Sequence, residues 1–178
     1  MKRIYFVRHA ETDSNVQRVF SGSGDNPKLT ALGREQAVKA GHELRDRNIA
    51  LIVVSPLTRT KDTAAIIAKE IGYNQNDIIY NQLFVERSFG YYEGRSHAEL
   101  KTDQDNNTVK NTGETMEEFN NRVVAAVDWL RTLEPDTILV VSHGGFGRML
   151  RVVDRNLLHD DFHIVERFDN CEIDEFTL

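Results

Sequence analysis

The sequence has one cysteine and no long hydrophobic run. A single cysteine, Cys171, excludes an internal disulfide bond and a metal site built from several thiolates. An isolated cysteine is usually a buried free thiol, so we assign Cys171 no chemistry. No segment approaches the roughly 18 apolar residues of a membrane-spanning helix. The apolar run IYFV near the N-terminus is too short for a signal peptide, so we expect a cytoplasmic protein with no membrane partner.

The sequence also has fewer basic than acidic residues. The chain has 22 Lys and Arg against 28 Asp and Glu, a formal net charge of −6. Nucleic acids are bound by basic surfaces, so we expect no nucleic-acid partner. A small anion remains compatible with the sequence, because it responds to the local field of its site. The length of 178 residues fits one domain covering 1–178.

Hydrophobic patterning predicts alternating strands and helices. Continuous apolar runs, typical of strands covered on both faces, lie at 3–7, 50–55 and 137–142. Helical spacing predicts helices at 30–48 and 145–158. Cap residues predict two more: one begins at Ser55-Pro56 and ends at Gly72, and one spans 115–133 after a capping box of Thr115 and Glu118.

This alternation predicts an α/β fold, with three α/β/α layers and a mostly parallel central sheet. The tail from residue 162 onward reads as one or two edge strands, with a turn near Asp169-Asn170. The polar stretch KTDQDNNTVKNTG at 101–113 is the part of the chain most typical of a flexible insert.

Three strand ends carry unusual side chains. The first strand ends in Arg8-His9, the second is followed by Arg59 one turn into its helix, and the third ends in His143 and two glycines. Ligands of open parallel sheets bind outside the carboxyl ends of the strands. We therefore expect two arginines and two histidines to converge at one edge.

Such a set predicts a phosphate site. Arginine offers a planar fork of donors that matches phosphate oxygens, and helix N-termini add N–H groups. A neutral histidine near a phosphate can attack phosphorus and hold the group as phosphohistidine. The leaving alkoxide then needs an acid, for which Glu86 in the segment LFVERSFGYYEG is the candidate. No nucleotide-cradling glycine motif occurs.

Several segments together resemble one family. FVRHAETDSN, LTALGREQA, SPLTRTKDTA, VERSFGYYEG, GET and VVSHGGFGRML occur in the order and spacing of the histidine phosphatase superfamily, in its phosphoglycerate-mutase-like branch. The resemblance covers residues 3 to about 150, and NCEIDEFTL is similar to the closing strand of that family. It implies a phosphoglycerate-mutase-like α/β/α fold with a cap insert at about 90–114, and this insert is short compared with the family pattern.

The resemblance also implies roles for individual residues. His9 would be the nucleophile, and Glu86 the general acid and then the base for water. Arg8, Arg59 and His143 would hold the phosphoryl oxygens. The further phosphate or substrate contacts that it implies are Asn15, Ser21, Gly22 and Gly144. Neither a metal nor a cofactor is expected.

Other residues compete for these roles. Glu93 and Glu11 are rivals of Glu86, although Glu93 is more typical of a structural residue that bonds loop backbone or a cation. His97 could line the mouth of the site. His159 and His163 have a spacing that could suit a metal on a helix, but no third ligand is evident.

Two positions depart from the usual family pattern. Ala10 stands where glycine is common after the nucleophile, which raises a question about backbone geometry there. Lys28 lies between the usual proline and leucine, so the rim near residues 23–28 could be shaped differently.

The leading interpretation is a metal-independent phosphatase acting on a small phosphorylated metabolite. A phosphoglycerate mutase is the alternative, but mutases of this family generally have a longer, more basic insert and a tail over the site. The segment 95–112 offers only Arg95, Lys101 and Lys110, and the chain stops after its predicted last strand. A silent phosphate-binding module would be expected to lack His9 or Glu86. The substrate stays open, as does the choice between monomer and homodimer.

Overall fold

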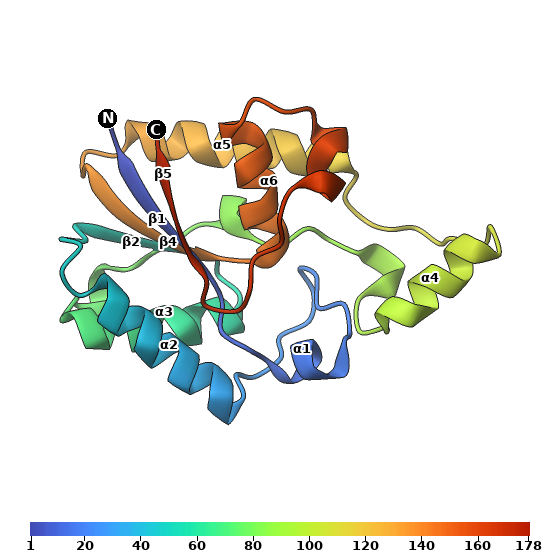
Figure 1. The fold of residues 1–178 in the computed structure, drawn as a ribbon, viewed down its shortest axis with the longest axis horizontal. Coiled ribbons are helices and arrows are strands. Elements are labelled where there is room, and N and C mark those ends of the chain that lie inside the picture. Colours follow the sequence, from blue (N-terminus) through green and yellow to red (C-terminus); the bar gives the residue numbers. More distant parts are fainter.

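The computed structural model describes residues 1–178, which form five strands, six α-helices and four short 3₁₀ helices (Figure 1). In chain order these are β1 (Arg3–Arg8), α1 (Asp13–Gln17), α2 (Ala31–Leu44), β2 (Leu51–Val54), α3 (Thr58–Ile71), η1 (Gln75–Asp77), β3 (Ile79–Tyr80), η2 (Gln82–Phe84), η3 (Gly90–Tyr92), α4 (His97–Asp105), α5 (Met116–Thr132), β4 (Thr137–Ser142), α6 (Gly144–Asp154), η4 (His159–Ile164) and β5 (Ile173–Thr177).

The five strands form one sheet in the order β3-β2-β4-β1-β5. All neighbours are parallel except β5, which pairs antiparallel with β1. The expected mostly parallel sheet is therefore confirmed, and the tail supplies one edge strand. Arg8 at the end of β1 pairs with Ser142 at the end of β4, so the residues that follow these two strands emerge side by side.

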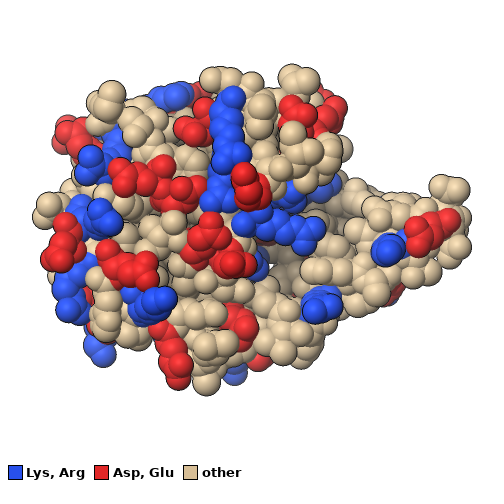
Figure 2. All heavy atoms as spheres, in the orientation of Figure 1, with Lys and Arg blue, Asp and Glu red and all other residues tan.

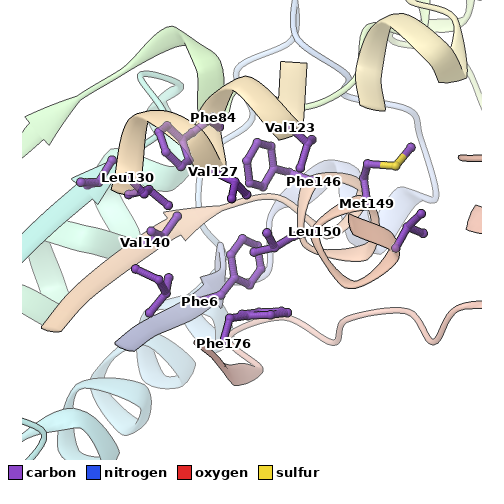
Figure 3. Close-up of a cluster of buried hydrophobic side chains, with 14 of the residues drawn as sticks. Phe6, Phe84, Val123, Val127, Leu130, Val140, Phe146, Met149, Leu150 and Phe176 are labelled. Carbon is purple, nitrogen blue, oxygen red and sulfur yellow. The ribbon is translucent and has the colours of Figure 1, made fainter. Parts of the chain in front are cut away.

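Helices lie on both faces of the sheet (Figure 1), and a hydrophobic cluster is buried under each layer of helices. Side chains alternate along β1, so that Phe6 joins the cluster under α5 and α6, while Tyr5 and Val7 join the cluster under α2 and α3. Figure 3 shows Phe6 packed among side chains from β4, α5, α6 and β5. Both faces of β1 are buried, which explains its continuous apolar sequence and makes it a rigid support for the residues that follow.

Most predicted elements are present, with shifts at their ends. The capping box of Thr115 and Glu118 at the start of α5 is confirmed. The helix after β2 begins differently from the prediction: its N-cap is Leu57, which makes no side-chain cap, and Ser55 lies before the helix. The short edge strand β3 was not predicted, because two residues are too few to show a hydrophobic pattern.

The segment between η3 and α5 leaves the sheet and projects from the main body, with α4 near its tip (Figure 1). The stretch 101–113, which was predicted to be a flexible insert, is helical in its first part, because α4 has Ser96 as its N-cap and extends to Asp105. Three backbone hydrogen bonds attach this projection to the segment after α1. Phe20 N–H donates to the Arg95 carbonyl, Gly94 N–H donates to the Phe20 carbonyl, and His97 N–H donates to the Arg18 carbonyl.

None of the helices combines the length and the apolar character needed to cross a membrane.

Candidate active site

A cavity of about 660 Å³ opens at the carboxyl ends of β1 and β4. Its wall contains eight of the nine predicted site residues: Arg8, His9, Asn15, Ser21, Gly22, Arg59, Glu86 and Gly144. The ninth, His143, is fully buried directly behind the wall, with its ring centroid 5.4 Å from that of His9. The structure therefore brings all nine together from segments far apart in the sequence. Of the rivals, His97 lines the cavity, whereas Glu11 and Glu93 do not.

His9 is held in one orientation by its own loop. Its Nδ1 atom lies 2.8 Å from the carbonyl oxygen of Ala10. A carbonyl oxygen can only accept, so Nδ1 carries the proton and the lone pair of a neutral ring is on Nε2. Burial, together with the positive charges of Arg59 and Arg8, holds the pKa of His9 well below its usual range. The ring is therefore neutral at neutral pH, which is the form that can act as a nucleophile.

Ala10 causes no backbone strain. It is fully buried against Leu29 and Ala37, and its φ is not positive. Its N–H donates to Thr63 Oγ1 at 3.0 Å. This loop conformation is open to alanine, so the departure from the family's common glycine leaves the geometry around His9 intact.

Two arginines, the buried Arg59 and the half-buried Arg8, lie beside His9 without a full set of hydrogen-bond partners. Arg59 is 1% exposed and donates to the carbonyls of Gly22 at 2.7 Å and Asp25 at 2.8 Å. Arg8 donates to the carbonyl of Phe168 at 2.5 Å. The Nε atoms of both arginines are buried with no partner in the protein. Burial lowers the pKa of Arg59 to about 10, and that of Arg8 in the same direction, so both remain charged.

His143 has the third unpartnered atom. Its Nε2 lies 2.8 Å from Ser55 Oγ, while its Nδ1 is buried and makes no hydrogen bond. Burial and the charge of Arg59 hold the pKa of His143 well below its usual range. Ser55, predicted as a helix cap, instead contacts this ring. The Nδ1 of His143 and the two arginine Nε atoms are the only buried side-chain N or O atoms in the protein without a partner.

Buried polar groups are almost always paired, so three unpaired nitrogens at one place point to a missing acceptor. All three can donate a hydrogen bond, and two of them belong to cations. An oxyanion is the group that would satisfy them together. The site is thus chemically suited to an anion with several oxygens.

The side chain of Asn15 is oriented by three hydrogen bonds that its Oδ1 atom accepts. Its Oδ1 accepts from Thr12 N–H, from Thr12 Oγ1 and from the side chain of Asn170, each at 3.1 Å. The amide Nδ2 of Asn15 has no partner in the protein and Asn15 lines the cavity, so this donor is available to a ligand. Asn170 also donates to the His9 carbonyl at 3.0 Å. Asn170 thus links His9 to Asn15 through one amide group.

The sequence did not indicate this role of Asn170. A turn was predicted near Asp169-Asn170, but a turn residue gives no signal of what its side chain contacts 155 to 161 positions away. Asn170 is positioned by the segment that follows it, which is attached to α6 through Arg151. Arg151 on α6 pairs with Glu172 and Asp174, both at 2.8 Å, and its guanidinium lies 3.6 Å from the Phe168 ring centroid.

Glu86 is fixed by two backbone donors. Its Oε2 accepts from Gly145 N–H at 3.0 Å and its Oε1 from Arg87 N–H at 2.9 Å. A Cβ atom at Gly145 would lie 2.4 Å from Oε1, so only glycine leaves room for this carboxyl group. The segment around Glu86 is held by Arg122 on α5, which donates to the carbonyls of Leu83 and Val85.

Glu93 is structural, as the sequence suggested. Its Oε1 accepts from the N–H groups of Ser23 and Phe89, both at 3.0 Å. It therefore joins the Ser21–Gly24 turn to the base of the projection. Gly22 has φ +51, and a Cβ atom there would lie 2.2 Å from Glu93 Oε1, so glycine is required on both counts.

No group of three or more His, Cys, Asp or Glu side chains is placed to hold a metal ion. His159 and His163 lie in η4, where the Nδ1 of His163 is next to the Asp160 carbonyl. The cationic donors at the cavity are arginines.

Comparison with known proteins gives the family. The profile of the histidine phosphatase superfamily (branch 1) matches residues 4–178. The Escherichia coli O1:K1 / APEC protein named "Probable phosphoglycerate mutase GpmB" is 36% identical over 155 residues, which cover 81% of this chain and 70% of that protein.

Solved structures agree in fold. The mycobacterial glucosyl-3-phosphoglycerate phosphatase complexed with VO3 has a TM-score of 0.87 at 25% identity and covers 99% of this chain and 93% of its own. The alpha-ribazole phosphatase of Shigella flexneri has a TM-score of 0.80 at 26% identity, covering 97% and 89%. With the family matched over nearly its whole length, this chain belongs to the histidine phosphatase superfamily, branch 1, and is a phosphoryl-transfer enzyme with a phosphoglycerate-mutase-like fold.

Proposed function

We propose that the protein is a metal-independent phosphomonoester hydrolase that acts through a phosphohistidine on His9. The observation that carries this proposal is the set of three unpartnered buried nitrogens, Arg8 Nε, Arg59 Nε and His143 Nδ1, around the free Nε2 of His9. A phosphoryl group bound to these donors would have its phosphorus facing the nucleophile. Arginines and histidine then stabilise charge on the equatorial oxygens, a role that other enzymes give to metal ions.

In the first step, His9 Nε2 attacks phosphorus, a P–N bond forms and the P–O bond to the alcohol breaks. Glu86 gives its proton to the departing oxygen. In the second step, a water oxygen attacks phosphorus, the P–N bond breaks, and Glu86 takes a proton from that water. Inorganic phosphate leaves, and both residues return to their starting states.

His143 donates from Nδ1 to a phosphoryl oxygen in both steps. Ser55 Oγ, donating to Nε2, would select the tautomer of neutral His143 that has its proton on Nδ1. Asn15 Nδ2 and the N–H groups of the Ser21–Gly22 turn and of Gly144 supply further donors. Gly144 begins α6, whose N-terminus favours negative charge.

Hydrolysis is favoured over mutase chemistry by the open mouth of the site. Arg18, His97 and Arg167 line the cavity and are solvent-exposed, so water can reach a phosphohistidine. The projection contributes His97 but no lysine or arginine to the cavity. Its Arg95 is paired with Glu99 at 2.8 Å. The similarity to the protein named phosphoglycerate mutase keeps the mutase as the alternative.

The test is release of phosphate from p-nitrophenyl phosphate between pH 5 and 8 in the presence of EDTA. We expect turnover in the wild type, none in His9→Ala, and wild-type turnover in His42→Ala, an exposed histidine of α2 paired with Glu70. Interconversion of phosphoglycerates without hydrolysis of any monoester would establish the mutase instead. Phosphate binding without any turnover would reduce the protein to a binding module.

The proposed substrate is a small phosphorylated metabolite, with no nucleic acid or membrane involved, and the protein is proposed to act in the cytoplasm as a monomer or homodimer. An alkaline SDS quench of the enzyme with a ³²P-labelled substrate should trap a phosphoryl group that is stable in base and is lost in acid. Failure to trap label in wild type while hydrolysis proceeds would point to direct attack by water instead of His9.

A further inference from the structure

The cavity contains more positive charge than one phosphoryl group uses. Five arginines line it, Arg8, Arg18, Arg59, Arg148 and Arg167, against the two carboxylates of Glu86 and Asp169. Arg8 and Arg59 lie beside His9 and belong to the phosphoryl site. Three arginines and one aspartate remain at the outer part, although the whole chain has a formal charge of −6.

Two of the outer arginines have no partner in the protein. The guanidinium groups of Arg18 and Arg167 make no hydrogen bond and no ion pair, whereas Arg3, Arg45, Arg95, Arg122, Arg131, Arg151 and Arg155 each pair with a carboxylate. Figure 2 shows Lys and Arg side chains beside the hollow between the main body and the projection with α4. Two unpaired arginine charges thus lie at the same opening.

Arg148 adds a fixed charge to the same region. Its Nε donates to the Val165 carbonyl at 2.7 Å and one terminal nitrogen to the His163 carbonyl at 2.6 Å. Its guanidinium lies 4.5 Å from the centroid of Phe162. None of these partners neutralises it. Burial and, after it, the charge of Arg167 lower the pKa of Arg148, and both arginines line the cavity.

His97, at the start of α4, lies near the outer arginines on the side of the cavity that the projection forms. Besides burial, the charges of Arg167 and Arg18 lower the pKa of His97, so both arginines are near it. The His97 ring packs on Phe20 with centroids 4.1 Å apart, and Phe20 packs on Phe89 at 4.6 Å. Phe20 and Phe89 line the cavity too. An apolar surface therefore lies beside the outer cations.

We propose that Arg18, Arg148 and Arg167 form a second anion subsite, so that the preferred substrates are phosphomonoesters bearing a second negatively charged group joined through a body that packs on Phe20 and Phe89. This inference rests on the proposed hydrolase and names its substrate class. A carboxylate or a second phosphate would satisfy the same donors. Mutual repulsion of the unpaired arginines is relieved when such a group binds, which favours the dianionic substrate over a neutral analogue.

Matched substrate pairs test the subsite. The probes are ω-carboxyalkyl phosphates of increasing chain length, each beside the ω-hydroxyalkyl phosphate of equal length. The phosphate ester and its leaving group are nearly the same within a pair, so the ratio of kcat/KM values isolates the second charge. We expect the carboxylate member to be preferred by about ten-fold at the best chain length, since two exposed charge contacts are each worth up to about a factor of five.

Three variants locate the effect. Arg18→Gln and Arg167→Gln should each lower the charged-to-neutral ratio about three-fold, and the double variant should lower it further, leaving only the preference that Arg148 supplies. Arg34→Gln is the matched control, because Arg34 is exposed on α2, makes no ion pair and does not line the cavity. Raising NaCl from 20 to 300 mM should lower the ratio in wild type and lower it less in the double variant.

The outcomes separate this proposal from the hydrolase on which it rests. A wild type that hydrolyses both members of each pair with the same efficiency overturns the subsite and leaves the hydrolase standing. A ratio that falls equally in Arg34→Gln also overturns it, because the preference then comes from overall charge. Absence of phosphate release from every probe rejects the proposed function itself, and the subsite with it. Preference for alkyl bisphosphates over carboxylates identifies the second anion as a phosphate.

Discussion

The side chain of Asn170 donates a hydrogen bond to the backbone carbonyl of His9 at 3.0 Å. The two residues are 161 positions apart in the sequence, and the same amide also contacts Asn15. A residue of the C-terminal turn thus determines where the first loop holds both its nucleophile and a proposed phosphate donor.

Asn170→Ala should therefore impair catalysis, because it removes the contacts that position His9 and Asn15. We expect kcat to fall about ten-fold, because small displacements of reacting groups are costly. The free energy of unfolding should fall by only about 1 kcal/mol per lost hydrogen bond. Kinetics and urea denaturation measure both. Asn76→Ala is the control, since Asn76 is exposed and remote from the cavity. A purely structural role would lower stability and leave kcat at the wild-type value.

Ser55→Ala should lower kcat/KM by about ten- to one-hundred-fold. The variant loses the contact between Ser55 Oγ and His143 Nε2, so the proton of His143 is no longer directed to Nδ1. An unpaired buried polar group costs about 1–3 kcal/mol. Ser55→Thr keeps the hydroxyl and should restore part of the activity. Equal activity in Ser55→Ala and wild type would contradict the proposed role of the tautomer.

Gly145→Ala should behave like a Glu86 variant. The added Cβ would lie 2.4 Å from Glu86 Oε1 and displace the carboxyl group. Proton donation matters most for poor leaving groups, so alkyl phosphates should slow more than p-nitrophenyl phosphate. Glu86→Gln is the reference for this pattern. If Gly145→Ala slowed both substrates by the same factor, the proposed acid role of Glu86 would lose its support.

Stability should fall as the pH falls below about 6.5. The native pKa values of His9 and His143 are lowered, while the unfolded chain has histidines near 6.5. In this window the unfolded state binds more protons, so the free energy of unfolding rises with pH, by up to about 1.4 kcal/mol per pH unit for each histidine. Urea denaturation at pH 7.5, 6.5 and 5.5 measures the slope. His143→Gln removes one titrating group and should reduce it; an unchanged slope would show that His143 does not contribute.

The main features of the fold were predictable because they depend on local patterns. Continuous apolar runs located β1, β2 and β4, and the Thr115–Glu118 pair located the start of α5. The parallel order then placed Arg8, His9 and His143 at one edge. The two-residue strand β3 was missed, since its signal is too short for any pattern.

The parts of the site that were not predicted depend on long-range contacts. Ser55 looked like a helix cap, and only the fold puts its hydroxyl against His143. Arg18 and Arg167 resemble ordinary surface arginines until the cavity brings them together. Asn170 is one polar residue in a turn. Its partners in the first loop cannot be inferred from neighbouring residues.

The antiparallel strand β5 has a consequence for biosynthesis. The segment that follows Asn170 is attached by the ion pairs of Arg151 with Glu172 and Asp174 and by the pairing of β5 with β1. A ribosome synthesises these residues after both catalytic histidines. The nascent enzyme should therefore remain inactive through most of its synthesis, and a chain released early by a premature stop before residue 170 should contain every catalytic side chain yet process little substrate.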